Sequence, residues 1–153
     1  MKRFFDSSAL VKRYIPETGT AWVQSTLRGT PRSDSYIACV TGREVMAAFA
    51  RRLRMGDITL AAYNVVATTF ERHFRRCYTR LPLSFPVVYT AMGLTRRHHL
   101  RGYDAVQLAT ALVLRDFLHR QGITGLTFVS ADDDLCRAAA AEGLLTENPN
   151  HYP

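Results

Sequence analysis

The sequence predicts an α/β fold, with a central, mainly parallel sheet and helices on both of its faces. The main observation is that short apolar runs alternate with longer segments of helical periodicity along the chain. The 153 residues have the length of one globular domain, and a hydrophobic content of 47% is enough for its core. No repeat, linker or low-complexity segment is present, so we expect a single domain over 1–153 with its core over about 1–147.

The first third of the chain contains two expected strands and two expected helices. Residues 3–5 form a short apolar strand, and a helix follows over 8–15, where Pro16 stops it. A second helix is expected over 20–28, before a segment rich in Gly, Pro and Ser. The compact apolar run 36–40 is expected to be a buried strand.

Two long helices follow and lead into the third strand. Residues 41–55 place apolar side chains four apart on one face, and 58–78 form a second long helix beyond Gly56. A strand is expected over 81–85, and Pro86 begins the next helix, which ends near residue 98.

The last third of the chain contains the helix that we expect at the centre of the fold. Residues 103–119 are apolar nearly all round, which is typical of a buried helix. A strand over 126–129, a helix over 134–142 and a short final strand at 144–145 complete the pattern.

The charge balance is basic. Lys and Arg together number 20 against 13 Asp and Glu, for a net charge of +7, and all the bases except Lys2 and Lys12 are arginines. A GC-rich genome also favours Arg over Lys, but it does not explain the net sign. A basic surface attracts nucleic acid or an anionic membrane.

Neither a disulfide framework nor a zinc site is indicated. Cys39, Cys77 and Cys136 are far apart and have no Cys or His at ligand spacing, which fits isolated thiols in a reducing compartment. The apolar run at the N-terminus is too short for a signal peptide, and no stretch approaches the roughly 18 apolar residues of a membrane span. We expect a cytoplasmic protein.

Four carboxylates follow the expected strands or begin the expected helices. They are Asp6, Glu44, Asp104 and Asp132. Each has a structural explanation when it is taken alone. Thr41 and Glu44 have the spacing of a capping box, Asp6 and Asp132 are good N-caps, and Asp104 complements a helix dipole.

The four acids together favour a different interpretation. If the strands are parallel, the acids converge at the edge of the sheet where ligands bind. Two carboxylates about 5 Å apart repel by about 3 kcal/mol at an effective dielectric constant of about 20, so such a cluster needs protonation or a cation. Oxygen ligands without His or Cys favour Mg²⁺ or Mn²⁺. In a basic protein, such ions suggest hydrolysis of a phosphodiester.

Four segments of the chain closely resemble PIN-domain proteins, and in particular the VapC-type toxins of bacterial toxin–antitoxin pairs. They are FFDSSALVKRY (4–14), VTGREV (40–45), GYDAVQLA (102–109) and FVSAD (128–132). The four occur in the family's order and spacing, and together they span essentially the whole chain. The resemblance implies a PIN-like α/β/α sandwich with metal-dependent endoribonuclease activity on structured RNA such as tRNA or ribosomal RNA. It also implies a VapB-type antitoxin as partner, and homodimerisation.

The resemblance also assigns residues to the site. Asp6, Glu44 and Asp104 match the family's acidic metal ligands. The fourth ligand falls within Asp132-Asp133-Asp134, where Asp132 matches best and Asp134 is the reserve candidate. Ser7 and Ser130 are polar neighbours that either bond a ligand or water or cap helices, and Arg43 either faces the phosphates or forms a surface ion pair.

Other clusters have less specific interpretations. Three groups of arginines, 51/52/54, 72/75/76/80 and 96/97/101, either contact RNA or an acidic partner or are solvated faces. His98 and His99 have no partner at ligand spacing and are interpreted as surface residues. Two alternatives to the toxin remain, namely a PIN nuclease that matures RNA and a non-catalytic module that binds RNA or protein.

Overall fold

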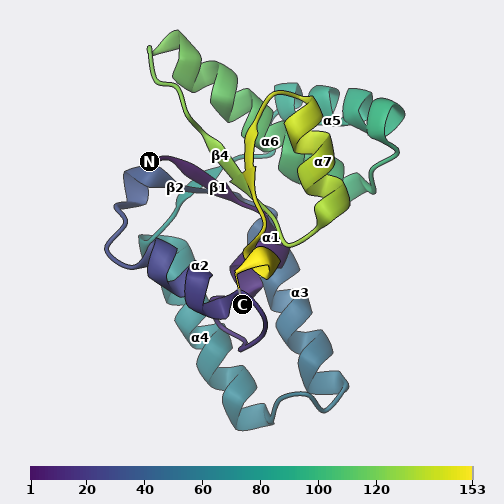
Figure 1. The fold of residues 1–153 in the computed structure, drawn as a ribbon. Coiled ribbons are helices and arrows are strands. Elements are labelled where there is room, and N and C mark those ends of the chain that lie inside the picture. Colours follow the sequence, from purple (N-terminus) through teal and green to yellow (C-terminus); the bar gives the residue numbers. More distant parts are fainter. Residues whose placement is uncertain (153) are drawn as a thin grey trace.

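A five-stranded parallel sheet lies between two layers of helices in the computed structural model, which describes residues 1–152 (Figure 1). The strand order is β3-β2-β1-β4-β5, and every neighbouring pair is parallel. The strands are β1 (Arg3–Phe5), β2 (Ser35–Ala38), β3 (Thr79–Leu81), β4 (Thr127–Val129) and β5 (Leu145–Glu147). The α/β class and the mainly parallel sheet predicted from the sequence are confirmed.

The helices are α1 (Ser7–Val11), α2 (Thr20–Leu27), α3 (Thr41–Arg54), α4 (Leu60–Arg76), α5 (Phe85–His98), α6 (Gly102–Arg120) and α7 (Asp133–Ala141). Two short 3-10 turns complete the described chain, η1 (Arg32–Asp34) and η2 (Pro149–His151). No helix within residues 1–152 is long and apolar enough to cross a membrane.

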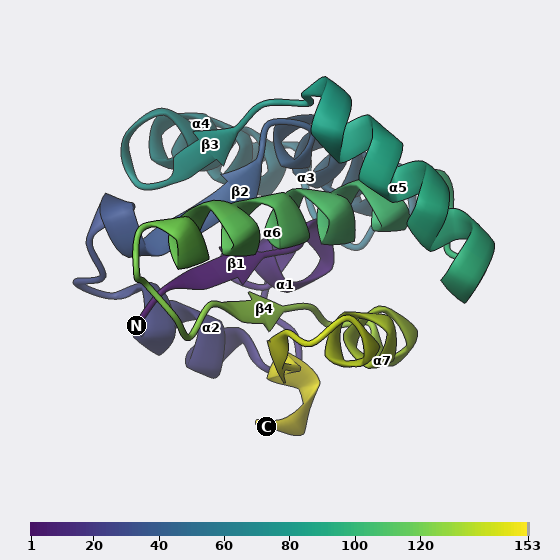
Figure 2. The same ribbon diagram turned by 90° about the horizontal axis from the view of Figure 1, so that it is seen from above.

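Successive side chains of the central strands point to opposite faces of the sheet and so divide the core into two halves. Phe4 packs with α5, α6 and α7, whereas the next residue, Phe5, packs with α1, α2, α3 and α4. Phe128 and Val129 on β4 divide in the same way, and the rings of Phe4 and Phe128 stack with centroids 5.7 Å apart. Because successive side chains of a strand point to opposite faces, a sheet of this kind is covered on both sides, as Figure 2 shows.

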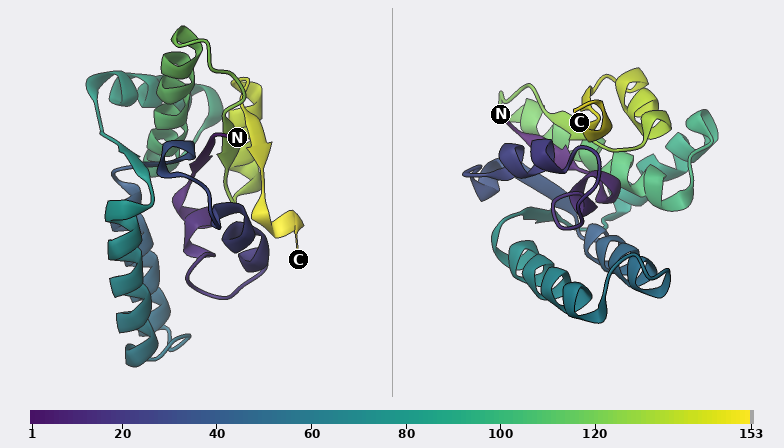
Figure 3. Two further views of the ribbon diagram at one scale, coloured as in Figure 1. Left: turned by 90° about the vertical axis from the view of Figure 1, so that its left-hand side faces the viewer. Right: turned by 60° about the horizontal axis from the view of Figure 1, so that its bottom comes forward.

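The helix pair α3 and α4 projects beyond the sheet as a hairpin (Figure 3). Its inner side belongs to the core, where Phe49 and Phe70 are almost fully buried with ring centroids 6.0 Å apart. The arginines of its outer part are largely exposed. The hairpin is therefore anchored at the sheet, and Arg51 and Arg54 are exposed near its tip.

Two expected elements are displaced in the structure. The third strand was expected over 81–85, but β3 pairs with β2 over Thr79–Leu81, and Phe85 already begins α5. Pro82 has no N–H to donate, which ends the ladder there. The first helix was expected to continue to residue 15, but α1 ends at Val11 and turns follow it.

Candidate active site

Asp6 lies at the carboxyl end of β1, where β1 and β4 run side by side. Its backbone N–H donates to the carbonyl of Val129 (2.9 Å), which fixes the residue against the neighbouring strand. The Oδ2 atom accepts hydrogen bonds from the hydroxyl groups of Ser8 (2.6 Å) and Ser130 (3.0 Å). It also caps α1 by accepting from the N–H of Ser8 (3.2 Å). Burial raises the pKa of Asp6, and the serine hydrogen bonds only partly oppose this rise.

Glu44 lies in the first turn of α3, directly beyond the end of β2. Its carboxylate accepts a hydrogen bond from the side-chain amide of Gln107, which is fully buried in α6. Burial is the main cause of the raised pKa of Glu44, and the negative charges of Asp6 and Asp104 raise it further. The hydrogen bonds from Gln107 and Ser7 act in the opposite direction.

The predicted capping box at the start of α3 is wrong. Val40, which has no capping side chain, is the N-cap, and Thr41 is already inside the helix. The hydroxyl of Thr41 is buried and accepts a hydrogen bond from Nε2 of Gln107 (2.9 Å). Gln107 was not singled out from the sequence, although a glutamine within an apolar helix is a signal that could have identified it.

Asp104 reaches the same region from the first turn of α6. Because α6 is the crossover that precedes β4, it starts at the carboxyl edge of the sheet and runs back across one face. The pKa of Asp104 is raised by burial and then by the charges of Asp6 and Asp132, while the positive charge of Arg101 opposes the rise. Asp104 is therefore electrostatically coupled to carboxylates from two other segments.

Asp132 follows β4 and is the N-cap of α7. Its Oδ1 atom accepts from the N–H groups of Asp134 (2.8 Å) and Leu135 (3.1 Å), so the structural explanation given from the sequence applies as well. Asp134 is exposed and pairs with Arg137, one turn further along α7. Asp133 accepts a hydrogen bond from Nδ2 of Asn148 (2.6 Å), which ties this loop to the C-terminal segment.

The four carboxylates thus converge at the carboxyl edge of the sheet, and their exposure increases in order. Asp6 is buried, Glu44 and Asp104 are partly buried, and Asp132 is exposed. Within residues 1–152, no three His, Cys, Asp or Glu side chains are already in place to hold a metal ion. Asp6, Glu44 and Asp132 each accept hydrogen bonds from the protein.

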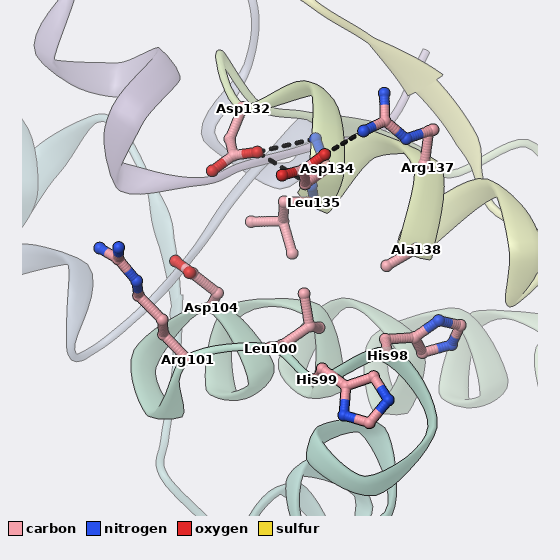
Figure 4. A pocket seen from close by; sticks show the side chains of 10 residues that line it. All are labelled: His98, His99, Leu100, Arg101, Asp104, Asp132, Asp134, Leu135, Arg137 and Ala138. Atoms are coloured by element: carbon pink, nitrogen blue, oxygen red, sulfur yellow. Dashed lines mark hydrogen bonds and ion pairs between the residues drawn. The ribbon is translucent and has the colours of Figure 1, made fainter.

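A cavity of about 510 Å³ opens beside two of these acids (Figure 4). Its lining includes Asp104, Asp132 and the reserve candidate Asp134. His98 from the last turn of α5 and His99 and Arg101 from the segment between α5 and α6 also line it. The two histidines therefore line this cavity at the end away from the carboxylates, and His99 is exposed, as expected for a surface residue. Sequence spacing alone could not show this, because the reversal of the chain between α5 and α6 brings them to the edge of the sheet.

Arg43 lies on the outer side of the cluster, next to Glu44. Its guanidinium stacks over the ring of Tyr103, the residue before Asp104, with 4.5 Å between the guanidinium carbon and the ring centroid. Both side chains are exposed. Within residues 1–152 Arg43 forms no ion pair, so of the two expected alternatives the surface ion pair is not seen, and a phosphate-facing Arg43 stays a prediction.

Comparison with known proteins identifies relatives over most of the chain. No family model matches the sequence. The chain is 34% identical over 113 residues to Ribonuclease VapC45 of Mycobacterium tuberculosis (strain CDC 1551 / Oshkosh), a match that covers 74% of this chain and 76% of the relative.

Solved structures show the same fold at lower identity. FitAcB from Neisseria gonorrhoeae is similar with a TM-score of 0.67 and 18% identity, over 97% of this chain and 99% of that one. A toxin–antitoxin complex from Klebsiella pneumoniae is similar with a TM-score of 0.64 and 17% identity, over 97% and 98% of the two chains. The carboxylates lie at the edge of the sheet, and the chain is 34% identical to a known ribonuclease over most of its length. The chain therefore belongs to the VapC family of PIN-domain ribonucleases.

Proposed function

We propose that this protein is the toxin of a VapBC-like toxin–antitoxin pair, an endoribonuclease that cleaves structured RNA such as tRNA or ribosomal RNA with the help of Mg²⁺ or Mn²⁺. The observation that carries the proposal is the convergence of four carboxylates from four segments in a protein of net charge +7. Burial raises the pKa values of Asp6, Glu44 and Asp104, and neighbouring carboxylates raise those of Glu44 and Asp104 further, an arrangement that a cation relieves.

The donor set fits a hard divalent cation. All four residues supply carboxylate oxygens, and none supplies sulfur or imidazole nitrogen. They are Asp6, Glu44, Asp104 and Asp132. Within the described residues, Asp104 accepts no hydrogen bond, and Asp132 accepts through Oδ1 alone, so oxygens are left to bind an ion. When bound, the ion would activate water and stabilise the charge of the leaving oxygen. Asp134 pairs with Arg137 and is the weaker candidate.

The protein's own residues orient this donor set. The hydroxyl groups of Ser8 and Ser130 fix Asp6, and the hydroxyl of Ser7 lies between Asp6 and Glu44, 3.3 Å from Oδ1 of Asp6. The Gln107 amide fixes Glu44 from the interior. Asp6 and Glu44 are thus each held by neighbouring side chains, which is what preorganisation of a charged site requires.

The proposed partners follow from the relatives and from the surface. A solved neighbour described as a toxin–antitoxin complex supports an antitoxin as partner. The outer face of α5 exposes Phe85 (80%), Tyr89 (69%) and Met92 (63%), and such an apolar face supports a homodimer. The proposal places the protein in the cytoplasm, where its RNA substrates are made.

Incubation of the purified protein with tRNA and ribosomal RNA, followed by sequencing of the new RNA ends, tests this function. We expect discrete cleavage in the presence of Mg²⁺ or Mn²⁺ and none in EDTA, and Asp6→Asn should abolish it without loss of the folded state. Equal cleavage by the Asp6→Asn variant would show that a contaminating nuclease, or another site, is responsible.

A further inference from the structure

The residues that follow β5 lie against the 130–133 loop, which joins β4 to α7 and carries Asp132. The backbone N–H of Ser130 donates to the carbonyl of Glu147 (3.1 Å), so the pairing of β4 with β5 extends to the start of this loop. The 3-10 turn η2, which comes next, packs against α2 (Figure 1). The C-terminal segment 148–152 therefore lies between a helix and the loop of a proposed metal ligand.

Two asparagine side chains of this segment bond the loop on either side of Asp132. Nδ2 of Asn148 donates to Oδ1 of Asp133 (2.6 Å), the residue after Asp132. Nδ2 of Asn150 donates to the carbonyl of Ala131 (3.0 Å), the residue before it. The residues on both sides of Asp132 are thus held from outside the loop.

Asn148 is buried and uses both ends of its side-chain amide. Its Oδ1 accepts from the N–H of Asn150 (2.9 Å) and so caps η2, while its Nδ2 donates to Asp133. Capping alone requires only an oxygen atom, which serine or aspartate would supply equally well. The nitrogen is what asparagine adds, and it bonds the loop.

The contact of Asn150 with the loop continues into the hydrogen bonds around Asp6. The N–H of Ala131 donates to Oγ of Ser8 (2.9 Å), and that hydroxyl donates to Oδ2 of Asp6 (2.6 Å). Ala131 is therefore bonded through its N–H by Ser8 and through its carbonyl by Asn150. A shift of the C-terminal segment would change the surroundings of Asp6 as well as those of Asp132.

The segment also has anchors that do not involve the loop. The ring of Tyr152 stacks on Trp22 of α2 with centroids 5.0 Å apart, and its hydroxyl donates to Oε2 of Glu147 (2.6 Å). Pro149 is buried, and its carbonyl oxygen lies only 2.4 Å from the position that a Cβ of Gly19 would take. The two asparagines are therefore carried by a support that is itself fixed, which positioning of another side chain requires.

We propose that Asn148 and Asn150 are positioning residues that hold Asp132 for metal binding. The role of Asp132 as a ligand rests on the proposed function. Within residues 1–152 neither asparagine forms a hydrogen bond to a proposed ligand, so both act through the loop. Asp132 is exposed, whereas Asp6 is buried, so the fixed loop is the main restraint on its carboxylate. Partners that orient a metal ligand typically change metal affinity by about 10- to 100-fold.

The variant Asn148→Ser keeps the cap and removes the contact with the loop. The serine hydroxyl still accepts from the N–H of Asn150, but it has no amide to donate to Asp133, and the charge of the protein is unchanged. We expect Mn²⁺ to bind about tenfold more weakly, as measured by isothermal titration calorimetry. If Asn148 only caps η2, the affinity of this variant equals that of the parent.

The variant Asn150→Ala removes the other contact at an exposed position, where a folding defect is not expected. The affinity for Mn²⁺ should fall about fivefold, as for the loss of one hydrogen bond. Tyr152→Phe is the matched control. It removes a hydrogen bond of the same segment that goes to the side chain of Glu147 and not to the loop, so the affinity should stay unchanged.

Amide hydrogen exchange in the metal-free protein gives a readout that needs neither metal nor RNA. The N–H groups of Asp134 and Leu135 donate to Oδ1 of Asp132, so their protection reports on the position of that carboxylate. Both asparagine variants should raise the exchange rates of these amides roughly fivefold and leave β1 unchanged. A purely structural role would raise exchange across the whole sheet.

The outcomes separate this inference from the proposed function. If the parent protein binds Mn²⁺ but cleaves no RNA, and the asparagine variants bind Mn²⁺ more weakly, the positioning role stands and the nuclease proposal fails. If the parent cleaves RNA and both variants keep its Mn²⁺ affinity and amide exchange, the positioning role is overturned. Equal losses in Tyr152→Phe would also overturn it, because the segment would then act on the fold as a whole.

Discussion

Gln107 hydrogen-bonds Glu44 from inside the protein, through a buried side-chain amide that also donates to Thr41. The two contacts use both hydrogens of the amide, so the orientation of Gln107 is fixed, and with it one oxygen of Glu44. We therefore regard Gln107 as a positioning residue for the proposed metal site.

Gln107→Leu should lower RNA cleavage by about 10- to 100-fold at limiting Mg²⁺, because Glu44 then loses the partner that orients it. Higher Mg²⁺ should restore much of the rate, which a simple folding defect would not allow. Thr41→Val is the matched control, since it removes the other contact of Gln107 and leaves the Glu44 contact in place. The cleavage rate of each variant is measured over a Mg²⁺ titration. The same dependence on Mg²⁺ in both variants would contradict this role of Gln107.

Asp104→Asn should abolish cleavage and leave the metal-free protein at least as stable as the parent. The charge of Asp104 is unfavourable in the folded state, because burial, Asp6 and Asp132 all raise its pKa. The asparagine side chain has nearly the shape of aspartate but no charge, so the substitution removes that repulsion. Thermal melting in EDTA measures the stability, and a clear fall in melting temperature would show that the Asp104 carboxylate stabilises the fold.

The stability of the metal-free protein should depend on pH through the same carboxylates. The folded state raises the pKa values of Asp6, Glu44 and Asp104, so it binds their protons more tightly than the unfolded chain does. Their contribution is fully present in acid and is lost as pH rises through the folded pKa values. Melting temperature in EDTA should therefore fall relative to Asp104→Asn as pH rises toward neutral, and Mn²⁺ should reverse that difference.

The parent protein must be compared with Asp104→Asn, because other groups change the stability with pH in the opposite direction. Hydrogen bonding to Lys2 lowers the pKa of Asp34, and the pKa of Glu142 is lowered by His98 and Arg97 although burial opposes them. Those contributions are lost as pH falls, in the variant as in the parent. An identical pH profile of the two proteins in EDTA would refute the coupling of the site carboxylates.

Asp132→Asn and Asp134→Asn should differ sharply in activity. Asparagine is as good an N-cap as aspartate, so α7 should keep its start in the first variant and only the carboxylate charge is lost. We expect a large loss of cleavage for Asp132→Asn and activity close to the parent's for Asp134→Asn. Parallel cleavage assays decide the assignment, and the reverse order of the two activities would make Asp134 the fourth ligand.

Gly19→Ala should destabilise the protein by more than Gly29→Ala. Both glycines have positive φ, but a Cβ at Gly19 would lie 2.4 Å from the carbonyl oxygen of Pro149, whereas a Cβ at Gly29 meets nothing within 4 Å. The conformational cost of about 1–2 kcal/mol is common to both, and the clash with the C-terminal turn is added for Gly19 alone. Thermal melting gives the comparison.

The fluorescence of Trp22 provides a local readout of the same change. The chain has one tryptophan, and its ring stacks on Tyr152 with centroids 5.0 Å apart. Displacement of the C-terminal turn by Gly19→Ala should alter its emission, and Gly29→Ala should not. Unchanged emission together with equal melting temperatures would show that the turn adapts to the added methyl group.

The strand-to-helix junctions were the most predictable part of the molecule. Buried apolar runs followed by Asp6 or Asp132 identify strand ends, and parallel pairing then places both acids at one edge. Thr41 shows the limit of such local reasoning. Its spacing to Glu44 satisfies a capping pattern, but the buried amide of Gln107, remote in sequence, is the partner that the fold supplies.

The loop between α5 and α6 was the least predictable part. Nothing in the spacing of His98, His99 and Arg101 relates them to Asp132, because their proximity depends on how α6 crosses the sheet and where α7 begins. The third strand was misplaced for a related reason. Pairing with β2 decides which residues form β3, and it begins at Thr79 instead of at the apolar residues after Leu81. This pairing depends on the whole sheet and cannot be read from the segment alone.

The pairing of β1 with β4 has a consequence for the synthesis of the protein. Asp6 emerges from the ribosome well before its hydrogen-bond partners Val129 and Ser130, the second of which lies 124 positions further along the chain. Asn150 then closes the segment by donating to the carbonyl of Ala131 (3.0 Å). Chains are made at roughly 5–20 residues per second, so a growing chain carries an incomplete site for several seconds, until β4 has been made. A site that depends on the pairing of β1 with β4 can form only after that point.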